Sequence, residues 1–172
     1  FYAGLKLGAP EQKVSFSVPT GNFGNILAGW IAMKLGLPIE KLICASNKND
    51  ILTRFFHTGR MERKNVLPSL TPSMDIQVSS NFERLLFEIL DRDTIKLNKL
   101  MDDFKNNNFY QLSKNIKESL EKTFLSYKIS DEETLDTIKT IYNKNNYLID
   151  PHTAIAVNAA KKAFVANKIE TS

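Results

Sequence analysis

Two glycines three residues apart, Gly21 and Gly24, lie in the string SVPTGNFGN between two apolar patterns of different period. Before them, residues 14–18 alternate between apolar and polar side chains, which predicts a short β-strand. After them, residues 25–35 carry apolar side chains at helical spacing, which predicts a helix with one apolar face. Glycine permits positive φ and the close approach of another group, and unpaired N–H groups at a helix start attract anions. The string therefore predicts a phosphate-binding turn.

The usual nucleotide-binding motifs do not accompany this turn. No Gly-Lys-Ser or Gly-Lys-Thr is present, and neither is a G-x-G-x-x-G string, so the nucleoside triphosphate and dinucleotide fingerprints are not met. Two glycines three apart are, by themselves, equally typical of a plain tight turn. The turn alone therefore leaves the phosphate unidentified.

The composition is that of an ordinary globular chain. Of its 172 residues, 42% are hydrophobic and 24% are charged, as in a folded domain. The net charge is +4, and the 23 Lys and Arg are interspersed with the 19 Asp and Glu, so we expect no nucleic-acid partner. The longest apolar runs are only a few residues, and the first residues do not resemble a signal peptide, so we expect no membrane partner.

Cysteine and histidine are scarce. Cys44 is the only cysteine, and His57 and His152 are the only histidines, which excludes an internal disulfide and argues against a zinc site. Cys44 lies in an apolar string and is expected to be a buried thiol. We therefore expect no metal site and a cytoplasmic location, where thiols stay reduced.

The order of the first predicted elements indicates an α/β fold. A second strand over residues 42–46 follows the first helix, and a strand-helix-strand unit predicts two parallel neighbouring strands. A further helix is predicted from Asn49 or Asp50 to Gly59. Both turns then lie at the carboxyl ends of parallel strands, where ligands bind in such sheets.

Residues 60–143 are predicted to be a largely helical insertion. Residues 60–80 look irregular, a helix resumes at Ser80 or Asn81, and residues 94–126 predict two amphipathic helices around the polar break KNNNF. We expect a single unit over residues 1–172, with its core formed by residues 14–59 and 144–166.

The last predicted elements form a second strand-to-helix junction. Ser130 and Glu133 have the spacing of a capping box for the helix before it. Residues 147–149 predict a short strand, and Asp150 is a good N-cap for the following helix. This arrangement places the Thr153 hydroxyl in the first helical turn.

Three separated strings resemble threonine synthase, in the same order along the chain. They are residues 18–59 (VPTGNFGNILAGWIAMKLGLPIEKLICASNKNDILTRFFHTG), residues 71–90 (TPSMDIQVSSNFERLLFEIL) and residues 147–157 (YLIDPHTAIAV). Threonine synthases are pyridoxal 5'-phosphate (PLP) enzymes of fold type II. They convert O-phospho-L-homoserine and water to L-threonine and phosphate. The resemblance implies a parallel-sheet βαβ core with added helices, PLP as the cofactor and a small phosphorylated amino acid as the substrate.

The resemblance also assigns cofactor-binding residues. It implies that Thr153 hydrogen-bonds the pyridine nitrogen of PLP, and that the cofactor's phosphate is held by Gly21, Asn22, Phe23, Gly24 and Asn25. A row of backbone N–H groups suits a dianionic ester. The simpler interpretation of Asn25 is a plain helix N-cap, which is compatible with binding the phosphate, and the alternative for Thr153 is that it bonds only its own helix.

Three more residues are candidates for the wall of the site or for substrate binding. Asn47 follows the second strand and faces the same crevice by topology, although it also suits a turn before the next helix. Asn81 and Arg84 are candidates for the substrate's phosphate, because Arg binds anions in a bidentate manner. An exposed helical arginine is the simpler interpretation of Arg84.

The family's Schiff-base lysine lies in an upstream segment, and nothing in this chain resembles it. The chain is therefore expected to be the carboxyl-terminal portion of the enzyme, with no catalytic residue of its own and no activity alone. Its expected partner is the missing upstream lobe. Two alternatives stay open: another fold type II lyase or dehydratase, and a non-catalytic homologue that binds phosphorylated ligands.

Overall fold

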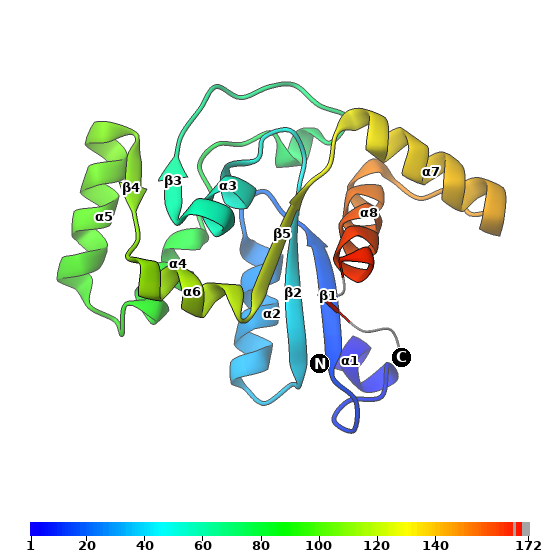
Figure 1. Ribbon diagram of the computed structural model, residues 1–172, viewed down its shortest axis with the longest axis horizontal. Helices are drawn as coiled ribbons and strands as arrows, with labels where there is room; N and C mark the ends of the chain where they lie inside the picture. The colour runs from blue at the N-terminus through cyan, green and yellow to red at the C-terminus, as the bar shows by residue number, and fades with distance from the viewer. Residues whose placement is uncertain (167, 170–172) are drawn as a thin grey trace.

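Three parallel strands form the centre of the fold (Figure 1). A computed structural model describes residues 1–166 and 168–169. In it β1 (Val14–Pro19), β2 (Ile39–Ser46) and β5 (Phe124–Lys128) lie in the order β1-β2-β5. The predicted parallel pairing of the first two strands is confirmed.

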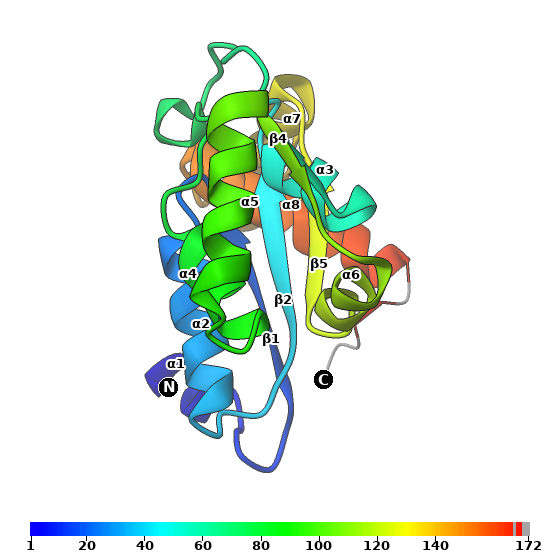
Figure 2. The ribbon, with the colours of Figure 1, turned by 90° about the vertical axis from the view of Figure 1, so that its left-hand side faces the viewer.

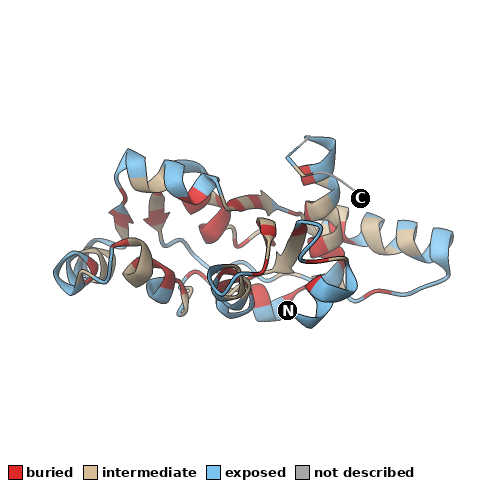
Figure 3. Cartoon of the chain, turned by 90° about the horizontal axis from the view of Figure 1, so that it is seen from below, coloured by how far each residue is buried: buried red, intermediate tan, exposed pale blue. Residues whose placement is uncertain are grey.

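Helices cover both faces of this sheet. α2 (Gly24–Lys34) packs on one face and α8 (Pro151–Val165) on the other, as Figures 1 and 2 show. The side chains of β2 alternate between two apolar clusters, because successive residues of a strand point to opposite faces. Leu42 and Cys44 join the cluster on the α2 side, and Ile43 and Ala45 join the one on the α8 side. Figure 3 shows buried residues in the middle of the fold and many exposed residues on the outer helices.

The remaining elements surround this layer. They are α1 (Tyr2–Lys6), α3 (Ile51–Thr58), β3 (Arg60–Glu62), a short 3₁₀ turn (Pro72–Met74), α4 (Phe82–Ile89), α5 (Thr94–Asn107), β4 (Phe109–Gln111), α6 (Lys114–Glu121) and α7 (Asp131–Asn145). α3 ends at Gly59 in the left-handed conformation, as predicted. The capping box of Ser130 and Glu133 is also confirmed.

Two predicted elements were wrong. Residues 124–126, expected to be helical, lie in β5, the third strand of the parallel sheet, and β3 and β4 pair in an antiparallel ribbon. The predicted helical insertion over residues 60–143 is therefore partly strand. Residues 147–149, expected to be a strand, lie in no strand. Tyr147 and Leu148 are 66% and 72% exposed and only Ile149 of the three is buried, so the segment does not bury an apolar face as a strand of the sheet does.

Cys44 is buried in β2, as expected. Burial raises the pKa of its thiol to about 12, so the thiol stays protonated at neutral pH. Among the described residues, no group of three or more His, Cys, Asp or Glu side chains is placed to bind a metal ion. None of the described helices is long and apolar enough to cross a membrane.

Candidate functional site

The turn from β1 into α2 lines a cavity of about 370 Å³. Residues 19–25 form one wall of this cavity, at the carboxyl end of β1. The opposite wall comes from Ser73 and Met74 in the 3₁₀ turn and from His152 in the first turn of α8. Three segments distant in the sequence therefore meet at this edge of the sheet.

The loop offers a row of unpaired hydrogen-bond donors. The backbone N–H groups of residues 21–25 have no hydrogen-bond acceptor within the described part of the chain. The loop's carbonyl groups, in contrast, are paired. Gly21 O accepts from Ser79 Oγ at 3.0 Å, and Asn22 O accepts from the backbone N and the Nδ2 of Asn81 at 3.1 and 3.0 Å. The loop is thus fixed through its oxygens while its donors remain available to an anion at the start of α2.

Phe23 gives the loop its shape. Its backbone is left-handed, with φ 64° and ψ 3°, and it is the N-cap of α2. Its side chain is 1% exposed and packs edge-to-face against Phe82, with ring centroids 4.9 Å apart. A left-handed residue beside a helical turn makes a concave row of N–H groups that binds anions. The sequence suggested positive φ at the two glycines, but the structure places it at Phe23, where burial of the ring compensates for the strain.

Gly21 is required for close packing. A Cβ on Gly21 would lie 3.2 Å from Met74 Cα and 3.2 Å from Ser73 O, so a larger residue would push the two walls a few tenths of an ångström apart. This confirms the close approach expected at the turn. Gly24 has more room, since its added Cβ would lie 3.4 Å from the nearest atom, Asn81 Nδ2. Asn25 lies inside the first turn of α2, so the interpretation of Asn25 as the N-cap was wrong.

A chain of hydrogen bonds forms the opposite wall. His152 Nε2 lies 2.7 Å from Ser73 Oγ, and His152 Nδ1 lies 3.2 Å from Asp150 Oδ1. Hydrogen bonds from Thr153, and then from His152, lower the pKa of Asp150 to about 2, so this carboxylate stays charged. The sequence by itself assigned no catalytic or binding role to Ser73 or His152. The signal was that both residues lie in the strings that carry the resemblance.

Thr153 lies next to the cavity but bonds its own helix. Its hydroxyl donates to Asp150 Oδ2, and its backbone N–H donates to Asp150 Oδ1 at 3.2 Å. The side chain is exposed on the first turn of α8. The local alternative for Thr153 is thus what the structure displays, and its role toward a pyridine nitrogen stays a prediction.

Asn47 lies behind the cavity wall and holds the segment that carries Ser73. It is fully buried, and its Nδ2 donates to Asp75 Oδ1 at 2.7 Å and to Ser69 Oγ at 2.8 Å. Burial acts to raise the pKa of Asp75, but hydrogen bonds from Ser69 and Asn47 outweigh it and lower this pKa below its ordinary value. Asn47 is not among the residues that line the cavity. It instead ties the segment that carries Ser73 to the end of β2.

Asn81 and Arg84 have different surroundings. Asn81 holds the loop through the two bonds to Asn22 O. Arg84 is exposed on α4 and lines a separate groove of about 1120 Å³ beside α2. The structure therefore does not bring Arg84 into the cavity of the loop, and a role for either residue toward a substrate stays a prediction.

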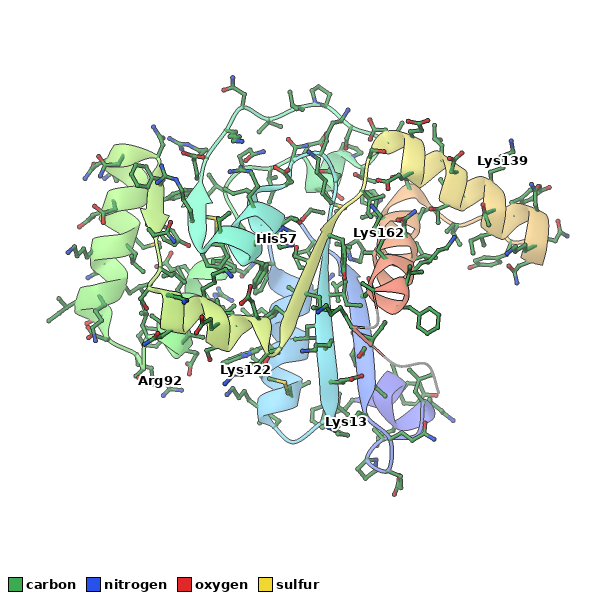
Figure 4. The ribbon with its side chains drawn as sticks, in the orientation of Figure 1. Lys13, His57, Arg92, Lys122, Lys139 and Lys162 are labelled. Carbon is green, nitrogen blue, oxygen red and sulfur yellow. The ribbon has the colours of Figure 1, made fainter. Side chains whose placement is uncertain are left out.

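Lysines lie away from this cavity. Among the described residues that line it, none is a lysine. The lysines labelled in Figure 4, among them Lys13, Lys122 and Lys162, are spread over separate parts of the fold. The described wall of the cavity thus has unpaired N–H donors but no amine that could react with an aldehyde.

Known proteins resemble this chain in both sequence and structure. The chain is 48% identical over 162 residues to threonine synthase from Pseudomonas aeruginosa, and 46% identical over 169 residues to that from Saccharomyces cerevisiae. These alignments cover 94% and 90% of this chain. They cover 34% and 33% of the relatives, so the chain spans about one third of the length of the curated relatives that it matches.

A solved structure agrees with these sequence relatives. The crystal structure of PLP-bound threonine synthase from Brucella melitensis matches this fold with a TM-score of 0.92 and 46% identity. The match covers 94% of this chain and 35% of that one. No protein-family model matches the chain.

Proposed function

We propose that this chain forms part of a PLP-dependent threonine synthase, because it is homologous to threonine synthases over about nine tenths of its length. The reaction is the conversion of O-phospho-L-homoserine and water to L-threonine and phosphate. The substrate is thus a small phosphorylated amino acid, and the other partner is the remainder of the same enzyme. We place the enzyme in the cytoplasm. The relatives and the solved structure named above are all threonine synthases, so neither another lyase nor a non-catalytic homologue is favoured.

The residues at the cavity fit the phosphate group of PLP. The observation that carries the proposal is the row of unpaired N–H groups in residues 21–25, at the amino end of α2. Among the described residues that line the cavity, none is acidic, so no carboxylate in its wall contacts a bound dianion. Fixed donors of this kind bind an anion without needing to reorganise, and they work together with the helix dipole.

Each part of the site then has a defined task. The loop anchors the phosphate, and Asn81 and Ser79 fix the loop through its carbonyl groups. Thr153 is proposed to hydrogen-bond the pyridine nitrogen. When bound, PLP supplies an electron-withdrawing ring that stabilises negative charge next to the amino group of a substrate. We expect the 172-residue chain alone not to turn over O-phospho-L-homoserine, because the amine that must hold the cofactor does not line this cavity.

Titration of the ¹⁵N-labelled chain with inorganic phosphate tests the anion site. We expect the amide signals of residues 21–25 to shift in a saturable manner. Gly24→Asp should abolish these shifts, because it places a carboxylate beside the anion. Gly24→Ala is the matched control, because the Cβ has room and the backbone donor is kept. Shifts confined to the segment of residues 60–64, which carries Arg60, Arg63 and Lys64, would refute the assignment.

The complete enzyme tests the proposed reaction. An enzyme carrying Gly24→Asp should lose PLP on dialysis and lose turnover of O-phospho-L-homoserine, whereas Gly24→Ala should retain both. Turnover of this substrate by the 172-residue chain alone would show that the amine has been misplaced.

A further inference from the structure

The side chain of His152 bridges a carboxylate and a hydroxyl at the edge of the cavity. Its Nδ1 lies 3.2 Å from Asp150 Oδ1 and its Nε2 lies 2.7 Å from Ser73 Oγ. His152 and Ser73 both line the cavity, opposite the loop of residues 20–25. The bridge therefore ends on a hydroxyl that faces the same space as the loop donors.

The charge of Asp150 decides how the imidazole is protonated. Asp150 is an ionised carboxylate at neutral pH, and an ionised carboxylate only accepts hydrogen bonds. Nδ1 of His152 must therefore carry a proton. In a neutral imidazole the other nitrogen, Nε2, then has no proton and accepts the hydrogen bond of Ser73 O–H.

The protonation state of His152 consequently sets the direction of the bond to Ser73. When the imidazole is neutral, the Ser73 O–H donates to His152 Nε2, so Ser73 presents only lone pairs to an anion. With a protonated imidazole Nε2–H donates to Ser73 Oγ. The Ser73 O–H is then free to donate into the cavity.

We propose that Ser73 is a further ligand of the phosphate group in this cavity, and that His152 is the proton switch that makes Ser73 a donor. The proposal rests on the phosphate site of the proposed function. Binding of a dianion then favours the protonated imidazole, so the anion and one proton bind together.

No other titratable group of the cavity competes for this role. Neither residues 19–25 nor residues 72–74 contain a titratable side chain, so of the described residues that line the cavity only His152 has an ionisable side chain. Asp150, on its own helix, is the charged group in contact with His152, and it remains ionised over this range.

The experiment uses sulfate, which stays dianionic between about pH 5 and about pH 8, the range in which histidine changes its charge. The amide shifts of residues 21–25 give the sulfate affinity of the 172-residue chain. We expect about tenfold tighter binding at the lower pH, the effect of one charge-assisted hydrogen bond. Calorimetry in two buffers of different ionisation enthalpy should show uptake of a proton with sulfate.

Three variants separate the switch from simpler effects. His152→Gln keeps a donor at Ser73 but cannot titrate, so its sulfate affinity should not change with pH. Ser73→Ala should lose most of the pH dependence. His57→Gln is the matched control and should behave as the unaltered chain, because His57 lies on α3 and bonds Ser126 O at 3.1 Å (Figure 4).

The outcomes distinguish failure of the switch from failure of the site. Sulfate that binds the loop equally well at both pH values would overturn the switch and leave the proposed function intact. Full pH dependence in Ser73→Ala would also overturn it, because His152 would then act by its charge alone. Absence of shifts at residues 21–25 at either pH would instead refute the phosphate site.

Discussion

The left-handed backbone of Phe23 can be tested by comparing two truncations at the same position. Phe23→Ala and Phe23→Gly both remove a ring that is 1% exposed. They differ in whether φ of 64° is strained, because glycine adopts this conformation freely and alanine does not. We therefore expect Phe23→Gly to be the more stable of the two proteins.

The magnitudes follow from the surroundings of the ring. Removal of a buried Phe side chain costs about 3–5 kcal/mol, and the contacts of Phe23 with Phe56, Phe82 and Phe124 are part of this cost. A left-handed alanine costs about 1–2 kcal/mol, while the greater unfolded-state freedom of glycine costs about 0.5–1 kcal/mol. The Gly variant should therefore exceed the Ala variant by about 0.5–1 kcal/mol.

Phe55 provides the control. It is also 1% exposed and belongs to the same aromatic cluster, but it lies within the helix α3. At a helical position glycine is about 1 kcal/mol worse than alanine, so the order should reverse. Urea unfolding of the four variants, followed by circular dichroism, gives the free energies. The same order at both positions would refute the claim that the loop requires a left-handed residue.

Three other changes test the walls of the site and its support. Gly21→Ala should weaken sulfate binding several-fold and cost about 1–3 kcal/mol in urea unfolding, because the new Cβ meets the backbone of Met74 at 3.2 Å; unchanged sulfate affinity would contradict this. Asn47→Ala should cost about 2–3 kcal/mol in the same assay, since it leaves the half-buried carboxylate of Asp75 short of a donor; a neutral result would mean that water replaces the amide. The pKa of Asp75 is lower in the folded chain than its unfolded value of about 3.9, so its contribution to stability is present above about pH 4 and is lost as the pH falls through the folded value. Unfolding free energies measured from about pH 6 to about pH 2 should therefore fall less steeply in Asp75→Asn than in the unaltered chain, and equal slopes would count against a lowered pKa.

The local elements of the site could be predicted from the sequence because their signals are local. Apolar periodicity located the first strand, its helix and the second strand, and the spacing of these elements required parallel pairing. Side chains that cap their own helix, such as Asp150, were identified for the same reason. The turn proposed to bind phosphate is likewise a short string whose glycines and helix start lie next to one another.

Only the tertiary structure decided which distant segments complete the site. The first part of β5, residues 124–126, is predicted to be helical because so short a segment has no clear period, and pairing with β2 makes it a strand. Phe23 holds the positive φ that glycine usually holds, because three buried rings from other elements compensate for the strain. Ser73 meets His152 across 79 residues of chain, and Asn47 turns away from the cavity toward Asp75. Local patterns determine where a chain turns, whereas hydrogen bonds and apolar burial between remote residues exist only once the chain has folded, and these contacts gave the cavity its second wall.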